Sequence, residues 1–264
     1  MGYLLKNYFF SMRSIFNPVS FSCLLCFFLL APVLHAGTIS TTNIETPAIN
    51  VVSISNPKSA SGGAFAEEVS FLYDQIDLKR FGLTKKAFEY AYKGYTYLLQ
   101  HHWLSRSNVL SICDFSQSSR KKRLYILDME EKKLLINTYV AHGRNSGSEY
   151  ARSFSNNPSS RKSSLGFYIT KQTYFGDHGL SLKIRGIEKG FNDKADHRNI
   201  VVHGSDYIGP DFLRWNRFSG RSYGCPAVPY DQSNEVIETI KDGSCLFIYY
   251  PTKKYIAKSK ILNS

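Results

Sequence analysis

The sequence predicts a mainly β domain that follows a small helical segment. From Val109 onward, short apolar runs with strand-like spacing alternate with polar segments that contain glycine, as in a sheet with turns between its strands. Before that point, apolar residues recur at intervals of three and four, as on one face of a helix. The first residues differ again, because a basic start leads into a long apolar run.

The predicted strands begin with a hairpin, in which a charged turn separates Arg123–Asp128 from Lys133–Ala141. The other strand-like runs are Gly166–Thr170, Leu180–Ile184, Asn199–His203 and Cys245–Tyr250. A short helix is predicted from Asp231 to Lys241, ended by Gly243. The longest segment between strands, Gly143–Ser164, has the length of a functional loop.

Two helices are predicted before the sheet. Ala66–Leu78 and Thr84–Leu99 carry the helical period, and Thr84 can cap the second helix. The residues that share one face of this second helix are Phe88, Ala91, Tyr95, Leu98 and Leu99. We interpret this face as core packing and not as a ligand site.

The N-terminal residues predict export. Residues 1–20 carry Lys6 and Arg13 and no acidic residue, and the apolar run Phe21–Leu34 leads to the small residue Ala36. Because this run is short for a membrane span, we interpret residues 1–36 as a signal peptide cleaved after Ala36. The protein is then expected in the periplasm or cell envelope. The alternative is an uncleaved N-terminal anchor, which would be its only contact with a membrane.

The chain of 264 residues has a formal net charge of +12, and removal of the leader leaves about +10. Such a charge favours anionic surfaces, such as cell-wall polymers, membranes or nucleic acid. The basic residues are scattered, and neither a glycine-rich loop nor a recognition helix accompanies them. A nucleic-acid partner is therefore not expected.

Three cysteines remain beyond the leader, so an exported chain keeps at least one free thiol. Cys113 and Cys245 lie in apolar runs and are interpreted as small buried hydrophobes, with a disulfide between them as the less favoured alternative. Cys225 is different, because it lies between a glycine and a proline in GRSYGCPAVP. This setting predicts a turn whose thiol a substrate can reach.

A cysteine nucleophile needs a base, because the thiolate is the reactive form. His203 ends a predicted strand in IVVHGSDY, and Cys225 follows 22 residues later. Gly224 allows a close approach of the backbone, and the amides of Tyr223, Gly224 and Cys225 can stabilise an oxyanion. The hydroxyl of Ser222 can add to that network.

The other histidines offer weaker candidates. His142, in VAHGR, is a second histidine followed by glycine and an alternative residue for the site. His178 follows Asp177 in a segment that we interpret as a solvated turn. Since no histidines have the spacing of a metal site, neither a metal nor another cofactor is expected.

HG followed about twenty residues later by S-x-G-C resembles the catalytic signature of the L,D-transpeptidase (YkuD-type) family of peptidoglycan enzymes. The runs VAHGRNSGSEYARSFSN, KSSLGFY, IVVHGSDYIGP and GRSYGCPAV resemble its murein L,D-transpeptidase catalytic-domain branch, over roughly Leu83–Pro251. The resemblance implies an L,D-transpeptidase-like β-sandwich with short helices. It also implies that Cys225 is the nucleophile and His203 the general base, oriented by the backbone carbonyl of Gly204. Ser222 and Gly224 match the serine and glycine of the cysteine motif.

Two positions depart from the family's pattern. Many members have a histidine where this chain has Tyr223, and an arginine or asparagine where it has Ala227. Arg221 is a candidate to replace the second group in substrate binding. Sortases would need an arginine after the cysteine and papain-like enzymes a histidine after it, and the chain has neither beyond Cys225.

The resemblance implies a reaction in two steps on the peptide stems of peptidoglycan. Cys225 attacks the amide between the L-centre of a diamino acid and the terminal D-alanine, and an amine of a second stem resolves the thioester. Resolution by water would instead make the protein an L,D-carboxypeptidase or endopeptidase, and a non-catalytic peptidoglycan-binding protein is a third possibility. The resemblance also implies acylation of the cysteine by carbapenems. We expect a monomer.

The predicted organisation has five parts. Residues 1–36 are the signal peptide, and 37–63 form a flexible linker rich in Ser, Thr, Asn and Pro. Residues 64–105 form a helical segment packed on the catalytic domain, which spans 106–252. Residues 253–264 form a basic tail.

Overall fold

The structure, a computed structural model, describes residues 57–264, so the predicted signal peptide and most of the predicted linker lie outside the described residues. The helices are α1 (Pro57–Gln75), α2 (Lys85–Gln100), α3 (Pro210–Trp215), α4 (Tyr230–Ile240) and α5 (Lys253–Lys258). The strands are β1 (Val109–Asp114), β2 (Leu124–Asp128), β3 (Lys133–Thr138), β4 (Gly166–Gly176), β5 (Gly179–Gly186), β6 (Val201–Ser205), β7 (Ala227–Pro229) and β8 (Cys245–Tyr249). Within these residues, no helix has the length and apolar character needed to cross a membrane.

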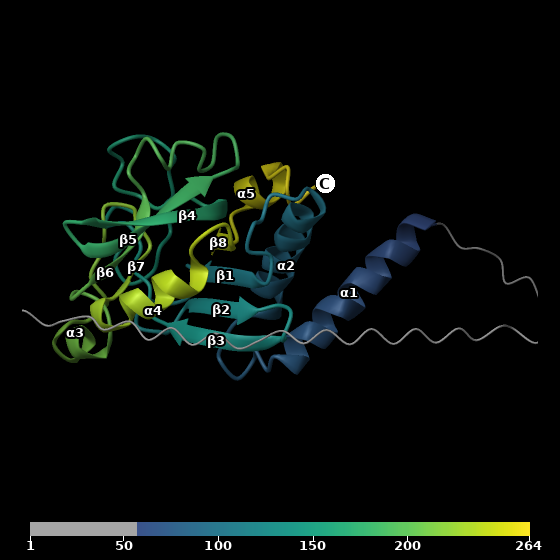
Figure 1. The fold of residues 1–264 in the computed structure, drawn as a ribbon, viewed down its shortest axis with the longest axis horizontal. Helices are drawn as coiled ribbons and strands as arrows, with labels where there is room; N and C mark the ends of the chain where they lie inside the picture. Colours follow the sequence, from purple (N-terminus) through teal and green to yellow (C-terminus); the bar gives the residue numbers. More distant parts are fainter. Residues whose placement is uncertain (1–56) are drawn as a thin grey trace, which may run out of the picture. The chain divides into compact units, whose positions relative to one another are not determined.

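The eight strands form one hydrogen-bonded sheet in the order β3-β2-β1-β8-β4-β5-β6-β7 (Figure 1). β1 pairs with β8 in parallel, and so does β6 with β7, while the other neighbours are antiparallel. The predicted mainly β class, with short helices and an N-terminal helical segment, is confirmed. The strands expected in a sandwich belong to a single continuous sheet.

The two edges of this sheet are joined by the chain that follows β3. Ala141 bridges to Ala227 of β7, and Gly143 bridges to Ser222. The amide of Ala141 donates a hydrogen bond to the carbonyl of Ala227 at 2.8 Å. Because β3 and β7 are the edge strands, these bridges bring the sheet's two ends together and close it toward a barrel.

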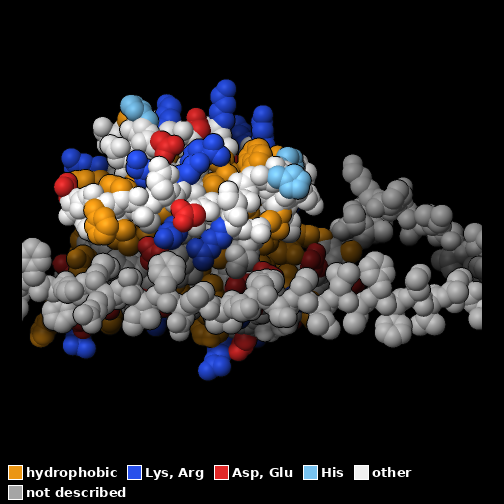
Figure 2. Space-filling model, in the orientation of Figure 1, with side chains coloured by type: hydrophobic (Ala, Val, Ile, Leu, Met, Phe, Trp, Pro, Cys, Tyr) orange, Lys and Arg blue, Asp and Glu red, His pale blue; other side chains and the backbone are white. Residues whose placement is uncertain are grey.

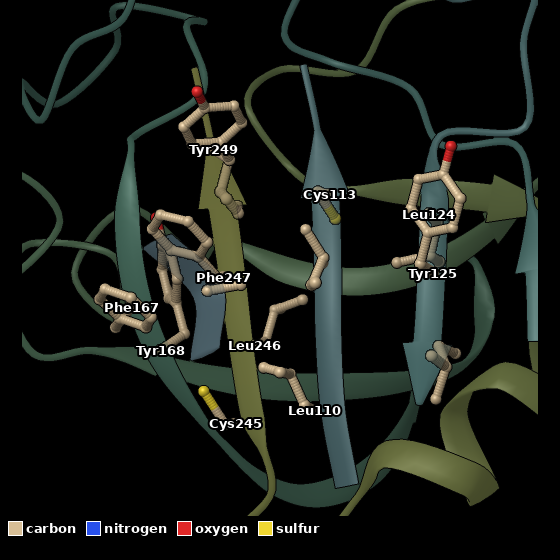
Figure 3. Packing of buried hydrophobic residues seen from close by; sticks show 14 of the residues in the cluster. Leu110, Cys113, Leu124, Tyr125, Phe167, Tyr168, Cys245, Leu246, Phe247 and Tyr249 are labelled. Atoms are coloured by element: carbon tan, nitrogen blue, oxygen red, sulfur yellow. The ribbon is translucent and has the colours of Figure 1, made fainter. Parts of the chain in front are cut away.

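The hydrophobic core lies around the central strands (Figure 3). Every residue of β1, β2 and β8 is buried. Phe167 of β4 stacks on Phe247 of β8, with ring centroids 4.1 Å apart. Cys113 and Cys245 are buried free thiols in this core, which agrees with their interpretation as small hydrophobes. The largely apolar runs of these strands suit strands that are covered on both faces.

Helix α2 packs against the core through the apolar face predicted from the sequence. Its start is capped by Thr84, whose hydroxyl accepts a hydrogen bond from the amide of Ala87 at 3.2 Å. Gly94 lies where the helix comes closest to the sheet. A Cβ added to Gly94 would lie 1.9 Å from a ring carbon of Phe167, so only glycine permits this approach.

Some predicted boundaries differ from the structure. The strand predicted at Asn199–His203 begins only at Val201. Asn199 has a φ of 51°, in the left-handed region that asparagine tolerates and a strand does not use. α3 and β7 were not predicted, because elements of six and three residues show no period in the sequence. α1 begins inside the predicted linker.

Residues 253–264, described above as a basic tail, include α5. Their buried apolar side chains are Tyr255, Ile261 and Leu262. The carboxylate of the buried Glu188 accepts hydrogen bonds from the hydroxyls of Tyr255, at 2.7 Å, and Ser259. Burial raises the pKa of Glu188, and the hydrogen bonds from Ser259 and Tyr255 oppose that shift. Residues 253–264 are therefore tied to the rest of the described chain through Glu188.

Lys and Arg side chains are spread over the face shown in Figure 2, and Asp and Glu side chains lie among them. The ion pairs found within residues 57–264 join neighbours two or three positions apart on the surface. Such exposed pairs contribute little to stability. The basic surface follows from the composition rather than from one concentrated patch.

The close contact between Gly94 and Phe167 predicts that adding one methyl group at position 94 destabilises the fold. Gly94→Ala is expected to lower the free energy of unfolding by about 1–3 kcal/mol, because the side chain of Phe167 is buried and must move. Gly63→Ala in α1 is the control, since nothing lies within 4 Å of its added Cβ. That variant should be neutral or gain up to about 1 kcal/mol. Urea denaturation measures both, and equal stability of Gly94→Ala and the parent would contradict the close packing.

Candidate active site

Cys225 lies in a tight turn directly before β7. The hydroxyl of Ser222 closes this turn, because it accepts a hydrogen bond from the amide of Gly224 at 3.1 Å and donates one to the carbonyl of Cys225 at 2.6 Å. Gly224 has a φ of 131°, which strains any residue with a side chain. A Cβ there would also lie 2.9 Å from the carbonyl oxygen of Lys162. The amide of Gly224 is thus used within the turn.

Strand pairing places this turn beside His203. β6 and β7 are neighbours in the sheet, and His203 is in register with Ala227, two residues after the cysteine (Figure 1). Cys225 and His203 line the same pocket. The thiol of Cys225 donates a hydrogen bond to the carbonyl of Asn199, with sulfur and oxygen 3.7 Å apart. At rest the thiol is therefore bound to backbone at the pocket's wall.

The ring of His203 is held on two sides. Its Nδ1 lies 2.9 Å from the carbonyl oxygen of Gly204, to which a neutral ring donates, so Nε2 is left as the proton acceptor. The ring of His178 stacks on it, with centroids 4.2 Å apart and planes inclined by 18°. Gly204 also lets α4 approach, since a Cβ there would lie 2.6 Å from the hydroxyl oxygen of Ser233.

Burial keeps the thiol and the imidazole neutral at rest. It raises the pKa of Cys225, while the backbone of Val201 and the charge of Arg198 oppose the rise. Burial lowers the pKa of His203, the hydrogen bond to Gly204 opposes this, and the charge of His178 lowers it further. The two groups therefore face the pocket as a thiol and an unprotonated base.

The pocket has a volume of about 870 Å³ and is lined by the cysteine turn, the start of β6 and the region of α3. Its basic residues are Arg144, Arg198, Arg217, Arg221, His178 and His203. Its aromatic residues are Tyr174, Tyr207, Phe212, Phe218 and Tyr223. None of the described residues that line it is Asp or Glu. The pocket combines positive charge with aromatic surface.

Arg221 and Tyr223, singled out from the sequence, both line this pocket. Arg221 donates a hydrogen bond to the carbonyl of Gly147 at 3.1 Å. Tyr223 is 64% exposed, and the guanidinium of Arg161 lies 4.8 Å from the centroid of its ring. Ala227, the other departure from the family's pattern, is buried in β7 and is absent from the pocket's lining.

His142 lies behind the cysteine turn and does not line the pocket. Its Nδ1 accepts a hydrogen bond from the buried Arg123 at 2.8 Å, and its backbone carbonyl accepts one from the amide of Ser222 at 3.1 Å. Burial, and then the charge of Arg123, lower the pKa of His142 to about 3. His142 is therefore a neutral residue that supports the turn and, unlike His203, does not line the pocket.

Sequence analysis missed Arg198, Asn199 and His178. No motif marks the first two, which reach the cysteine only because β6 and β7 pair. His178 was interpreted as part of a solvated turn; it is exposed, yet the β4–β5 hairpin places its ring on His203. Of the predicted functional loop, only Arg144 lines the pocket, and the rest of the loop includes the segment that packs behind Gly224.

Comparison with known proteins identifies one family. The model of the L,D-transpeptidase catalytic domain matches residues 79–249, which is more than half of the chain. No curated protein matches the sequence.

Two solved structures are similar to part of the chain. An L,D-transpeptidase from Mycobacterium smegmatis has a TM-score of 0.33 and 10% identity, over 54% of this chain and 59% of that one. An L,D-transpeptidase from Xylanimonas cellulosilytica, residues 123–326, has a TM-score of 0.31 and 15% identity, over 64% of this chain and 81% of that one. The chain thus spans less than two thirds of the mycobacterial protein's length.

The buried His142 predicts a loss of stability in acid. Its pKa is about 3 in the folded state against an ordinary 6.5, so the unfolded state binds more protons between these values. The free energy of unfolding should therefore fall by about 2 kcal/mol between pH 7 and pH 5 through this residue. Denaturant titrations at both pH values should show a smaller fall in His142→Asn than in the parent. His197→Gln, at an exposed position, is the control, and an unchanged fall in His142→Asn would contradict the assignment.

Proposed function

The chain belongs to the L,D-transpeptidase catalytic-domain family, and from that premise we propose that Cys225 forms a thioester with a peptidoglycan stem peptide and transfers it to an amine acceptor. The main support is one observation: the thiol of Cys225 and the imidazole of His203 line a single pocket, and Gly204 holds the ring so that Nε2 accepts a proton. A thiol beside an oriented base is the arrangement that nucleophilic acyl transfer needs.

In the first step, Nε2 of His203 takes the proton of the thiol as Sγ attacks the amide carbon between the diamino acid's L-centre and the terminal D-alanine. The oxyanion accepts hydrogen bonds from the backbone amides of Tyr223 and Cys225. Within residues 57–264 these two amides have no other acceptor, whereas the amide of Gly224 is bound to Ser222. His203 then protonates the nitrogen of the leaving D-alanine, and the thioester remains.

In the second step, an amine of another stem attacks the thioester carbon and gives a proton to His203. The carbon–sulfur bond breaks, the thiolate leaves and takes up that proton, and a new amide joins the two stems. Water in place of the amine would release a free acid, and the enzyme would then be an L,D-carboxypeptidase or endopeptidase. Product analysis separates these outcomes.

The charge of the pocket suits a stem peptide with free carboxylates. Four arginines line it, and none of its lining residues within 57–264 is acidic. Guanidinium groups bind carboxylates through charge-assisted hydrogen bonds. Within residues 57–264, the hydrogen bonds of Arg221 all use Nη1, which leaves its other nitrogens to bind a substrate.

The proposed steps use a thiol, an imidazole and backbone amides, so they require no metal or cofactor. We place the protein in the periplasm or cell envelope because of its leader sequence. One chain supplies every residue that the two steps use, and the proposal therefore works with a monomer.

Intact mass after exposure to a carbapenem tests the nucleophile and the oxyanion site together. The parent should gain the mass of one carbapenem and Cys225→Ala should gain none, while Cys113→Ala, which removes a buried thiol, should still react. His203→Gln should acylate about a hundredfold more slowly or worse. No adduct on a parent whose thiol is free would overturn the proposal and favour a peptidoglycan-binding protein.

A charge change at the rim of the pocket tests the proposed substrate. Arg217→Gln is expected to raise KM for a stem with free carboxylates about three- to tenfold and to leave kcat nearly unchanged. An amidated stem should show a smaller change. Arg214→Gln is the matched control, because Arg214 lies in α3, pairs with Asp211 and does not line the pocket. Equal effects of the two variants in steady-state kinetics would argue against carboxylate binding.

A further inference from the structure

Arg198, in the turn before β6, is a cation with only neutral partners. Its Nη1 donates to the carbonyl of Ser155 at 2.9 Å and to the hydroxyl of Ser164 at 2.5 Å. Its Nη2 donates to the carbonyl of Lys162 at 2.7 Å and to the hydroxyl of Ser160 at 3.2 Å. No carboxylate within residues 57–264 forms an ion pair with it. Its positive charge is therefore held in place without being neutralised.

The guanidinium of Arg198 lies against the residue that precedes the nucleophile. A Cβ built on Gly224 would be 3.2 Å from Nη2 of Arg198. The next residue, Asn199, accepts the hydrogen bond of the Cys225 thiol. Arg198 and Cys225 also line the same pocket. The guanidinium of Arg198 thus lies next to the backbone of the cysteine turn, and Asn199, which follows it in the chain, binds the thiol.

The other groups around the thiol leave Arg198 as the main source of positive charge there. His203 is neutral at rest, because burial lowers its pKa. Burial raises the pKa of Tyr207, which keeps that phenol neutral as well. Tyr223 and His178 are exposed to solvent at the pocket's rim.

The remaining arginines of the pocket are placed less well for this role. Arg144 and Arg217 are exposed, and solvent screens an exposed charge. Arg221 is half-buried like Arg198, but its guanidinium binds the carbonyls of Arg144 and Gly147, whereas that of Arg198 lies against Gly224, next to the cysteine. Arg198 is half-buried, and a fixed cation favours the charged form of a nearby thiol more strongly away from water.

We propose that Arg198 is a positioning residue that stabilises the thiolate of Cys225 and holds the cysteine turn against the segment 155–164. When His203 removes the thiol proton, negative charge appears on Sγ beside a cation that is already oriented. Burial alone would disfavour that charge, and the charge of Arg198 is among the influences that oppose burial at Cys225. The inference deepens the proposed function, because the thiolate is the species that the proposed acyl transfer needs.

The rate of alkylation of Cys225 by iodoacetamide between pH 6 and pH 10, followed by peptide mass spectrometry, tests this inference. Alkylation reports the thiolate fraction whatever reaction the protein catalyses, so failure of the inference and failure of the proposed function are distinguishable. Arg198→Gln should react about three- to tenfold more slowly at pH 7.5, with its profile moved to higher pH. Arg198→Lys keeps a positive charge beside the thiol and should therefore keep the parent profile within about twofold.

Arg161→Gln is the control, because it removes a cation from the neighbouring Tyr223 ring and not from the thiol. Its profile should match that of the parent. A profile of Arg198→Gln that matches the parent would overturn the inference. An equal loss of alkylation rate in Arg198→Gln and Arg198→Lys at every pH would also overturn it, because a purely structural role affects both variants alike. If Arg198→Gln does not fold, the test rests on Arg198→Lys. The inference would be overturned if the alkylation profile of Arg198→Lys moved to higher pH and its rate at pH 7.5 fell more than twofold below that of the parent.

Discussion

The placement of Cys225 depends on a buried guanidinium. Arg123 is fully buried, and its nitrogens donate to the carbonyls of Val140 and Gln117 and to the ring of His142. Burial lowers the pKa of Arg123 to about 10, so it stays charged at neutral pH. A buried charged donor without a partner costs several kcal/mol, so the chain at 140–142 has one acceptable position. The backbone of that segment then binds the turn that carries Cys225.

The same hydrogen bonds close the sheet. The bridge from Ala141 to Ala227 joins the chain beyond one edge strand to the opposite edge strand. The parallel pair of β6 and β7 then sets His203 and Cys225 at one wall of the pocket. The same contacts therefore contribute both to closure of the sheet and to the position of the candidate site. A change that weakens the Arg123–His142 contact should disturb both stability and the position of the thiol.

The electrostatics of the site follow from burial in a basic chain. Burial keeps the thiol protonated and the imidazole neutral, so little separated charge has to be sustained before substrate binds. In the proposed reaction, the arginines around the pocket favour an anionic substrate, and Arg198 favours the thiolate that forms during attack. The thiolate would then exist only while the proton moves, whereas the basic lining is present throughout.

Much of the fold and part of the candidate site could be predicted from the sequence, because the patterns that predict them involve residues close together in the chain. Hydrophobic periodicity, helix capping and turn formation depend on neighbouring residues in the chain. The mainly β class, the cap at Thr84 and the turn around Cys225 could therefore be predicted. His203 could be named as the candidate base because it ends a strand before glycine. The strand boundary at Asn199 was missed, since a left-handed backbone angle leaves no periodic trace.

Only the tertiary structure decided which residues distant in the sequence surround the thiol of Cys225. Arg144, His178, Arg198 and Arg217 come from four separate segments that meet when the sheet closes and the β4–β5 hairpin folds back. It also distinguished two histidines that look alike in the chain, because both precede glycine. His142 is buried and hydrogen-bonded to Arg123, whereas His203 lines the pocket. Burial and charge depend on contacts across the sheet, and no local pattern contains them.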